Sequence, residues 1–305
     1  MTESLMEIRS KRYGSFLMFP SQIINEGAQA TLIAGVKKDT KEPVIIKLSK
    51  VFSLGYSEDS TPSDKTHLLQ EANILAQLRY LEGIPTYFGL HRIRHDNNLE
   101  QLALIAQRIE GDNIEKIFQH RQNKRFTAIE ALDFLKKAAL ILKETHKRNI
   151  IHCDLKFSNF MIDRRDRLSI IDWGSAQIID RAKAEKNVKQ KKPIVGTIQF
   201  MSYEHLIGRA LDERTDIYAL GLVVAVLTYG PAISQRYIFD KDKHTVERPK
   251  SELIKVLSNG ETPKFHLIAK PRNQAEQKIL EIVYQMTAPN KYLRPRSMQA
   301  VLDKL

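Results

Sequence analysis

The sequence is poor in cysteine and has no long apolar run, and both absences exclude classes of protein. Its single cysteine, Cys153, cannot form an intramolecular disulfide, and no zinc-type spacing is present. The longest apolar stretch, from Ile217 to Tyr229, is too short to span a bilayer. Residues 1 to 13 are charged and lack an apolar core, so no signal peptide is expected. These features predict a cytoplasmic protein in a reducing compartment.

Basic residues outnumber acidic ones: the sequence has 48 Lys and Arg and 36 Asp and Glu, which gives a formal net charge of +12. Such a charge favours an acidic partner, either a nucleotide, an acidic protein, an anionic lipid or a nucleic acid, and does not choose among them. No block of Lys and Arg is interleaved with aromatic residues as a surface for stacking single strands would be. A nucleic acid is therefore not expected as a partner.

One segment carries most of the chemical information. The run from His152 to Asn159 reads HCDLKFSN, and the run from Asp172 to Gly174 reads DWG. Two acids, a lysine and an asparagine at this spacing are what phosphoryl transfer from ATP needs. We predict Asp154 and Lys156 as catalytic residues. Asn159 and Asp172 are predicted as ligands of Mg²⁺, which prefers hard oxygen donors.

This segment resembles the catalytic loop and metal motif of protein kinases, H-R-D-L-x-x-x-N followed by D-F-G. The run from Val44 to Lys47 is similar to the kinase strand motif V-A-I-K, and Glu71 fits the helix glutamate that holds its lysine. The later kinase motifs follow in order, with Gly196-Thr197, the run from Phe200 to Glu204, Asp216, Gly221, and Arg294 as the expected partner of Glu204.

The resemblance covers roughly residues 20 to 305 and implies an α+β fold of two lobes. A leader of low structural signal would occupy residues 1–20, a sheet-rich N-lobe residues 21–110, and a mainly helical C-lobe residues 111–305, the lobes forming one catalytic domain. It implies a serine/threonine protein kinase that uses ATP and Mg²⁺ and acts on a protein, which the charge suggests is acidic. The residues expected to bind the nucleotide are Lys47, Glu71, Gly27, Gln107, Ile109, Asp112 and Met161.

The chain departs from the kinase pattern at several positions. Only Gly27 remains of the three glycines in the phosphate loop, Ile45 replaces the alanine usually found over the adenine, and Ala106 aligns with the gatekeeper. Glycines allow the backbone to approach phosphates closely, so tight closure of this loop is in doubt while the fold is not. Asp112 is open to two interpretations, as a ribose contact or as a hinge-turn residue without a ligand.

The segment from Ala176 to Gly196 contains no Ser, Thr or Tyr, and Cys153 stands where most kinases have an arginine that receives an activation-segment phosphate. Both absences predict activity without phosphorylation of this segment. The segment is basic, and either a solvated loop or recruitment of an acidic substrate would explain that. Its cationic residues are Arg181, Lys183, Lys186, Lys189, Lys191 and Lys192.

Two other functions remain open at this point. A pseudokinase scaffold is favoured by the thin glycine loop, Ile45 and Cys153, whereas the complete set of catalytic residues disfavours it. A small-molecule or lipid kinase is disfavoured by Lys156 and Thr197, because a lysine two places after the acid is typical of serine/threonine kinases. The compact form is similar to eukaryotic-like kinases of bacteria, including those delivered into host cells, which would place the protein in a host cytosol.

Hydrophobic patterning predicts the main elements. Strands are expected at 23–33, 43–48, 85–91 and 102–109, and a helix from 63 or 64 to 81. Thr127 and Glu130 form a capping box before a helix. The buried stripe expected on that helix consists of Ile129, Leu132, Leu135, Ala139 and Leu142. Residues 217–228 are apolar on every side and predict a buried helix.

Overall fold

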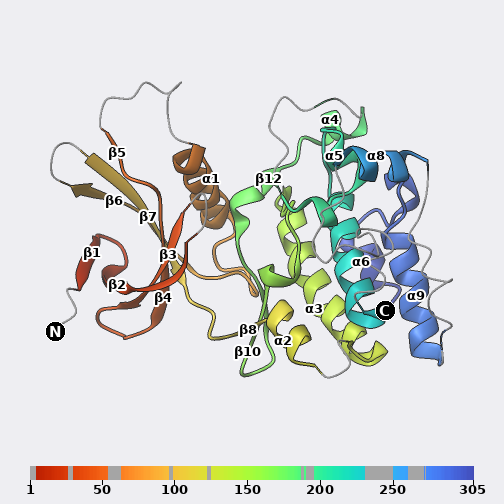
Figure 1. Ribbon diagram of the computed structural model, residues 1–305, viewed down its shortest axis with the longest axis horizontal. Coiled ribbons are helices and arrows are strands. Elements are labelled where there is room, and N and C mark those ends of the chain that lie inside the picture. The colour runs from red at the N-terminus through yellow and green to blue at the C-terminus, as the bar shows by residue number, and fades with distance from the viewer. Residues whose placement is uncertain are drawn as a thin grey trace. The chain divides into compact units, whose positions relative to one another are not determined.

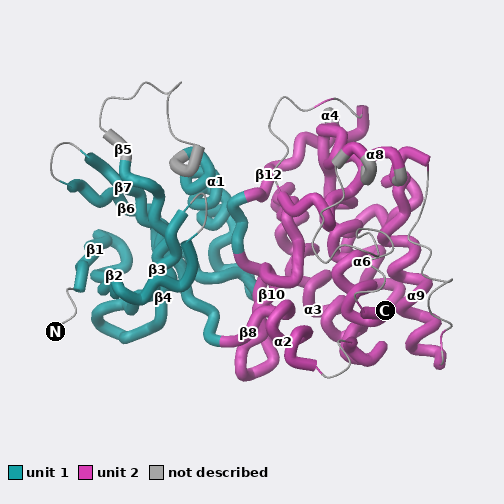
Figure 2. Tube along the Cα trace, viewed as in Figure 1, with its two compact units in different colours: residues 1–110, 172–174 teal, residues 111–171, 175–305 magenta. Residues whose placement is uncertain are grey.

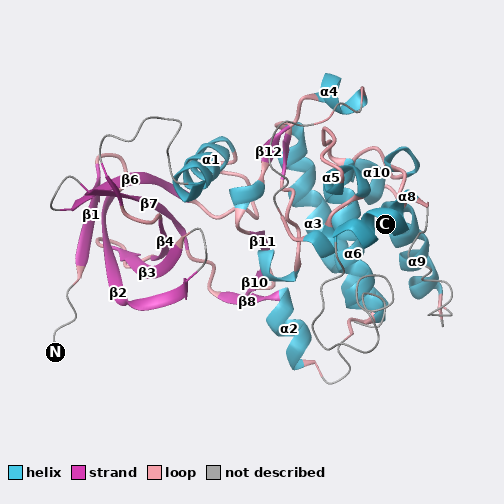
Figure 3. Ribbon diagram, turned by 45° about the horizontal axis from the view of Figure 1, so that its top comes forward, coloured by secondary structure: helices cyan, strands magenta, loops and turns pink. Residues whose placement is uncertain are grey.

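The computed structural model describes residues 5–26, 30–53, 63–95, 99–121, 125–186, 189, 196–230, 250–259, 271 and 273–305. The chain divides into two compact units, one of residues 1–110 with 172–174 and one of residues 111–171 with 175–305 (Figure 2). The first unit is mainly strand and the second mainly helix, which confirms the predicted α+β class (Figure 3). The first unit runs to Glu110, where the N-lobe was expected to end, and also takes in residues 172–174.

Within the described residues, unit 1 is a seven-stranded antiparallel sheet with the helix α1 against it (Figure 1). The sheet order is β1-β2-β3-β4-β7-β5, and β6 pairs with β7. The helix, α1 (Ser63–Gln77), contacts β6 and β7. The strands are β1 (Met6–Ser10), β2 (Gly14–Glu26), β3 (Thr31–Lys37), β4 (Pro43–Leu48), β5 (Phe52–Ser53), β6 (Tyr87–His95) and β7 (Leu99–Gln107).

The core of unit 1 follows the two-residue period of its strands. Val44, Ile46 and Leu48 of β4 are buried, so the intervening Lys47 lies on the other face of the strand. The side chains that pack with them come from β1, β2, β3, β6 and β7. One apolar cluster therefore joins the outer strand β1 to the strand that carries Lys47.

Several predicted boundaries in this unit need correction. Residues 1–20 were expected to be a leader with little structure, yet β1 and the start of β2 lie there and Phe16 is fully buried. The physical reason is strand pairing, since residues 6–10 pair with residues 14–18 and turn their apolar side chains into the common core. The single strand expected at 23–33 is the end of β2 and the start of β3. The helix ends at Gln77 and not at Leu81.

The described part of unit 2 consists of helices with two small sheets, ordered β11-β10-β8 and β12-β9. The strands are β8 (Gly111–Asn113), β9 (Ile150–Ile151), β10 (Phe160–Asp163), β11 (Leu168–Ile170) and β12 (Gln177–Ile178). The helices are α2 (Ile114–His120), α3 (Ala128–Lys147), α4 (Arg181–Glu185), α5 (Tyr203–Leu206), α6 (Arg214–Tyr229), α8 (Lys250–Ser258), α9 (Gln274–Met286) and α10 (Met298–Leu302).

The buried helix predicted at 217–228 is confirmed as part of α6, in which every residue from Thr215 to Tyr229 is buried. Helix α9 packs closely on α6 at Gly221. A Cβ atom at Gly221 would lie 2.8 Å from Cβ of Met286, so any larger residue would push the two helices apart. Within the described residues, no helix combines the length and the apolar character needed to cross a membrane.

The capping box at the start of α3 is confirmed. The Thr127 hydroxyl accepts from the backbone N–H of Glu130, and the Glu130 carboxylate accepts from the backbone N–H of Thr127. The expected stripe was wrong at Ile129, whose surface is 74% exposed. Ala128, Ala131 and Phe134 are buried instead, which rotates the apolar face by about one position and lets small residues carry much of the contact.

Candidate active site

The first set of predicted site residues lies in unit 1 around Lys47. Its ammonium is 2.7 Å from Oε2 of Glu71 on α1 and 3.1 Å from Oδ1 of Asp172. Glu71 is buried, whereas 45% of the Asp172 side chain is exposed. The ion pair expected between Lys47 and Glu71 is therefore present, and Asp172 shares the same cation.

Burial shapes the charges of this set. Burial alone would lower the pKa of Lys47, but the carboxylates of Glu71 and Asp172 raise it, so the ammonium stays charged. Burial raises the pKa of Glu71, and the negative charge of Asp172 adds to that effect, while Lys47 opposes it. The result is a permanent cation held by one inner and one outer carboxylate, an arrangement that suits binding of phosphate oxygens.

The second set lies in unit 2, after strand β9. The Lys156 ammonium donates to Oδ2 of Asp154 at 2.9 Å and to the Thr197 hydroxyl at 3.2 Å. The backbone N–H of Thr197 donates to the other oxygen of Asp154 at 2.7 Å. Asp154 is 8% exposed, and its two carboxylate oxygens are held in a fixed direction by these contacts.

Asn159 lies beside this set in a short 3₁₀ helix, Phe157–Asn159. Its side-chain N–H donates to the backbone carbonyl of Asp154 at 2.8 Å, and the residue is 3% exposed. This bond fixes the amide so that its oxygen is the atom available to a cation. An amide oxygen of Asn159 and a carboxylate of Asp172 are donors of the kind that Mg²⁺ prefers.

Asp216 at the start of α6 holds the loop that carries Asp154. Its carboxylate accepts from the backbone N–H groups of His152 and Cys153 at 2.8 and 3.0 Å, and Nε2 of His146 lies 2.9 Å from it. Burial would raise the pKa of Asp216, but these hydrogen bonds and the nearby histidines lower it. The loop backbone is thus tied to a carboxylate in α6, whose residues from Thr215 to Tyr229 are all buried.

Cys153 itself occupies a demanding backbone position, with φ of 65° and 6% of its surface exposed. Burial, together with the charges of Asp216 and Asp154, raises the pKa of the Cys153 thiol far above its usual value. The side chain packs with Ile151, Ile179 and Leu211 in a small apolar cluster. Where most kinases have an arginine, this chain has a neutral, buried thiol.

Lys291 is a functional candidate that the sequence did not indicate. It is 5% exposed, and its ammonium donates to the carbonyl of Ala184 at 2.9 Å and to Asp212 at 3.0 Å. Arg181 adds a second link, because its guanidinium donates to Glu213 at 2.8 Å and to Asn149 at 3.1 Å. These cations fasten α4, which lies within the segment 176–196, to the rest of unit 2.

The hinge and ribose contacts predicted from the resemblance remain predictions. Gln107 ends β7, and its side-chain oxygen accepts from the backbone N–H and hydroxyl of Thr86 at 3.3 and 3.2 Å. Asp112 in β8 pairs with Lys116 at 2.6 Å, a contact that suits its interpretation as a turn residue. Met161 in β10 pairs with Asn113 of β8, and Ile109 is half-buried. Gly27 lies outside the described residues.

A profile of the family described as "Protein kinase domain" matches residues 20–305. The chain belongs to the protein kinase family. The family match includes all the predicted site residues and leaves out β1 and the first part of β2. The order of the motifs along the sequence and the family profile therefore lead to the same assignment.

Curated relatives of this kinase carry serine/threonine kinase names. The chain is 26% identical over 211 residues to "Serine/threonine-protein kinase PknD" of Protochlamydia amoebophila, covering 61% of this chain and 21% of the relative. It is 30% identical over 127 residues to "Probable serine/threonine-protein kinase PknB" of Corynebacterium glutamicum, covering 42% and 19%. For PknB of Mycobacterium tuberculosis the identity is 35% over 106 residues, covering 34% and 17%. The kinase thus spans about a fifth of the length of these relatives.

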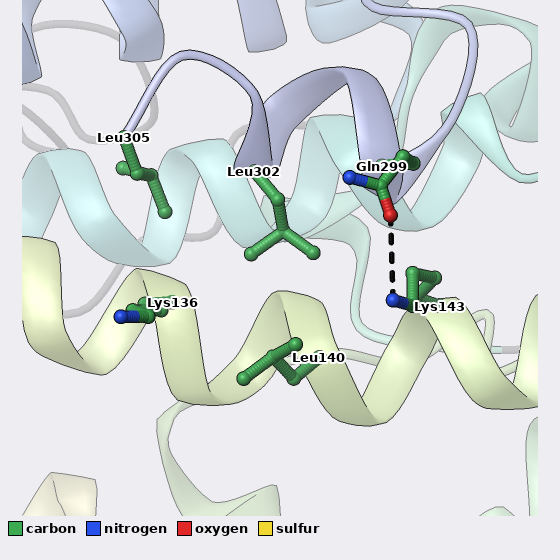
Figure 4. Close-up of a pocket in the computed structure, with 6 residues that line it drawn as sticks. All are labelled: Lys136, Leu140, Lys143, Gln299, Leu302 and Leu305. Carbon is green, nitrogen blue, oxygen red and sulfur yellow. Dashed lines mark hydrogen bonds between the residues drawn. The ribbon is translucent and has the colours of Figure 1, made fainter.

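A groove of about 340 Å³ lies elsewhere in unit 2, between α3 and the C-terminal residues (Figure 4). Leu140 faces Leu302 across it, and the Lys143 ammonium donates to Oε1 of Gln299 at 3.3 Å. Lys136 and Leu305 complete the lining. None of the predicted site residues lines this groove.

Proposed function

We propose that this kinase is a serine/threonine protein kinase, which transfers the γ-phosphate of ATP to a protein hydroxyl and needs no phosphate on its segment 176–196. The single observation that carries the proposal is the network of Asp154, Lys156 and Thr197. A fixed carboxylate next to a lysine suits transfer to an aliphatic hydroxyl, because the acid orients the nucleophile while the cation meets the transferred phosphoryl group.

Each residue has a distinct task in this proposal. Asp154 accepts the hydrogen bond of the acceptor hydroxyl and takes its proton as the bond to phosphorus forms. Lys156 neutralises charge on the transferred group, and Lys47, held by Glu71, binds phosphate oxygens. Asn159 and Asp172 would hold Mg²⁺, which supplies positive charge to the phosphates. The leaving group is ADP.

Independence from phosphorylation is supported by the contacts of α4. A phosphate normally orders an activation segment by pairing with cations. Here α4 is held without a phosphate. Lys291 donates to the Ala184 carbonyl of α4 and to Asp212, and Arg181 of α4 donates to Glu213 and Asn149. Burying the Lys291 ammonium carries a desolvation cost, and its hydrogen bonds to two acceptors offset most of that cost. These contacts hold α4 in place without a phosphate.

An acidic protein substrate is the class we propose for the acceptor. Lys186 and Lys189 are exposed in the same segment, and Arg181 is half exposed although paired. Side chains of Lys183, Lys191 and Lys192 lie outside the described residues. Exposed cations attract an acidic sequence and raise its association rate, an effect that falls with salt.

The proposed activity is tested by transfer of labelled phosphate from ATP to dephosphorylated casein, an acidic protein, and to histone, a basic one. We expect label on serine and threonine, more on casein than on histone, and none on tyrosine. Asp154→Asn keeps the size of the side chain and should lower transfer by about 10²- to 10⁴-fold. ATP should still raise the melting temperature of this variant. Binding of ATP by the wild type without any transfer would favour a pseudokinase instead.

Independence from phosphorylation is tested separately by treating the purified kinase with a phosphatase before the assay. We expect turnover to persist after treatment and to fall in Lys291→Met, which loses the hydrogen bond from Lys291 to the Ala184 carbonyl of α4. Lys304→Met is the matched control, because Lys304 is exposed at the end of the chain. Turnover that disappears on phosphatase treatment would contradict this part of the proposal.

A further inference from the structure

Strand β1 and the first part of β2 precede the segment that matches the kinase family, yet they complete the core of unit 1. Ile8, Phe16 and Met18 belong to the same apolar cluster as Ile46 and Leu48, which flank Lys47 on β4. All three are less than 7% exposed. Residues 5–19, which we call the N-terminal hairpin, therefore pack against the strand that carries Lys47.

Tyr13, at the turn of the N-terminal hairpin, reaches the end of α1. Its ring packs edge-on against Phe88 with centroids 5.9 Å apart, and the Arg79 guanidinium lies 5.4 Å from its centroid. Arg79 follows the last residue of α1 by two positions and also lies 5.6 Å from Tyr87 and 5.8 Å from Tyr80. One cation at the end of the helix is thus held among three tyrosine rings.

Ring faces, and not hydrogen bonds, hold this contact. Among the described residues, the Tyr13 hydroxyl and Nε of Arg79 are buried and have no hydrogen-bond partner. A guanidinium within 6 Å of an aromatic face is attracted by the ring quadrupole, most strongly where water is excluded. A phenyl ring at position 13 should serve as well as a phenol, which gives the experiment its control.

The position of α1 matters because this helix carries Glu71. Glu71 must meet Lys47 at 2.7 Å, and the two residues lie on different elements, α1 and β4. The N-terminal hairpin touches both elements, through the apolar cluster at β4 and through Arg79 at the end of α1. A segment with contacts on both sides of an ion pair can set the population in which the pair is formed.

We propose that the N-terminal hairpin is a latch for the kinase, in which Tyr13 grips Arg79 and holds α1 where Glu71 can pair with Lys47. Tyr13 and Arg79 are positioning residues in this view, since they touch neither substrate nor phosphate. The kinetic consequence rests on the proposed phosphoryl transfer, whereas the structural consequence does not. The first experiment therefore uses no activity at all.

Hydrogen exchange of the full chain compares wild type, Tyr13→Ala and Tyr13→Phe. We expect amides of α1 to exchange on the order of tenfold faster in Tyr13→Ala, those of β7 to keep their protection, and Tyr13→Phe to match wild type. Unchanged protection of α1 would overturn the latch. Equal acceleration in β7 would also overturn it, because the change would then be general loosening of unit 1.

A kinetic cycle then asks whether the latch acts through the ion pair. In the wild-type background, Tyr13→Ala should lower kcat about tenfold, which is the same order as its effect on hydrogen exchange. In the Glu71→Gln background, Tyr13→Ala should change kcat little. The same fold-loss in both backgrounds would overturn the coupling to Glu71. If the wild type shows no transfer, the proposed function fails, and the exchange experiment still decides on the latch.

Discussion

Two buried glutamates, one in each unit, pair with cations in ways that serve different ends. Glu71 and Glu204 are each 5% exposed, and both lie within 2.7 Å of a cationic nitrogen. Burial raises the pKa of Glu71 above its usual value, and Lys47 does not cancel the effect. Burial also acts on Glu204, yet the charge and hydrogen bonds of Arg294 outweigh it and hold the pKa of Glu204 below its usual value.

The geometry of the cation explains the difference. Arg294 donates to both oxygens of Glu204, at 2.6 and 3.1 Å, and to the carbonyls of Ala288, Pro289 and Arg214. Lys47 makes one contact to Glu71 and divides its charge with Asp172. The planar guanidinium is saturated by its own unit, whereas the ammonium keeps capacity for a further anion. A cation whose donors are all used, such as Arg294, suits a structural ion pair. A cation that can still bind another anion, such as Lys47, suits a binding site.

The largest expected effect is on stability, from Arg294→Met. This change leaves the Glu204 carboxylate buried without its partner and should lower the free energy of unfolding by about 3–5 kcal/mol. Urea denaturation followed by circular dichroism measures it. Arg294→Lys should recover only part of the loss, because an ammonium cannot make the paired contacts. A loss below about 1 kcal/mol would contradict the view that the Glu204–Arg294 pair stabilises the fold.

The next effect is on turnover, from Glu71→Gln. Without the Glu71 carboxylate, the Lys47 ammonium is no longer fixed in one orientation. We therefore expect kcat to fall about 10- to 100-fold. The free energy of unfolding should change by less than about 1 kcal/mol, since the glutamate already carries a desolvation cost in the folded state. Denaturation and steady-state kinetics on one preparation measure both. A stability loss as large as that of Arg294→Met would make the two pairs equivalent.

The pH dependence should separate the two glutamates. Protonation of Glu71 breaks its pair with Lys47, so turnover should fall as pH drops through a pKa raised above 4.5. Because that pKa is raised, this protonation favours the folded state. The pKa of Glu204 is depressed below 4.5, so its stabilising effect is present above the unfolded value and is lost only as pH falls through the lower value. As pH is lowered, turnover should therefore be lost before the protein unfolds. Loss of turnover and unfolding at the same pH would contradict this prediction.

The smallest effect comes from a third pair, Arg121 with Glu130, which shares the paired geometry of Arg294 but is partly exposed to solvent. Its two contacts are 2.8 and 3.0 Å, and 41% of the Glu130 side chain is accessible. Arg121→Ala should cost no more than about 1 kcal/mol, because water screens exposed ion pairs. Thermal denaturation tests whether burial, and not bond number, sets the cost. Thr127→Ala, which removes the cap itself, should cost about 1 kcal/mol.

The contacts of the candidate site residues were easier to predict from the sequence than the sheet of unit 1. Lys47, Glu71, Asp154 and Asn159 are found in contacts that fit their motifs, because short spacing rules confine them. The strands within residues 6–20 were not predicted, because they are recognisable only from their pairing with each other and their packing in the core. The family match also begins too late to include them.

Long-range contacts explain what else the sequence missed. Lys291 reaches Ala184 across 107 positions, and no spacing rule links an ordinary lysine to a backbone carbonyl so distant. The exposed Ile129 was placed in the stripe by periodicity, whereas smaller alanines fit the space against neighbouring helices. Asp216 was recognised by its motif, but its bonds to the N–H groups of His152 and Cys153 became visible only in the fold.

The buried thiol of Cys153 makes the kinase convenient for spectroscopy. Its raised pKa keeps the sulfur protonated, and thiolate-directed dyes and alkylating reagents should react with it slowly in the native state. A single cysteine introduced on an exposed position, such as Lys304 or Tyr80, would then take up a fluorophore without background. Pairs of such labels would allow distances between the two units to be followed in solution.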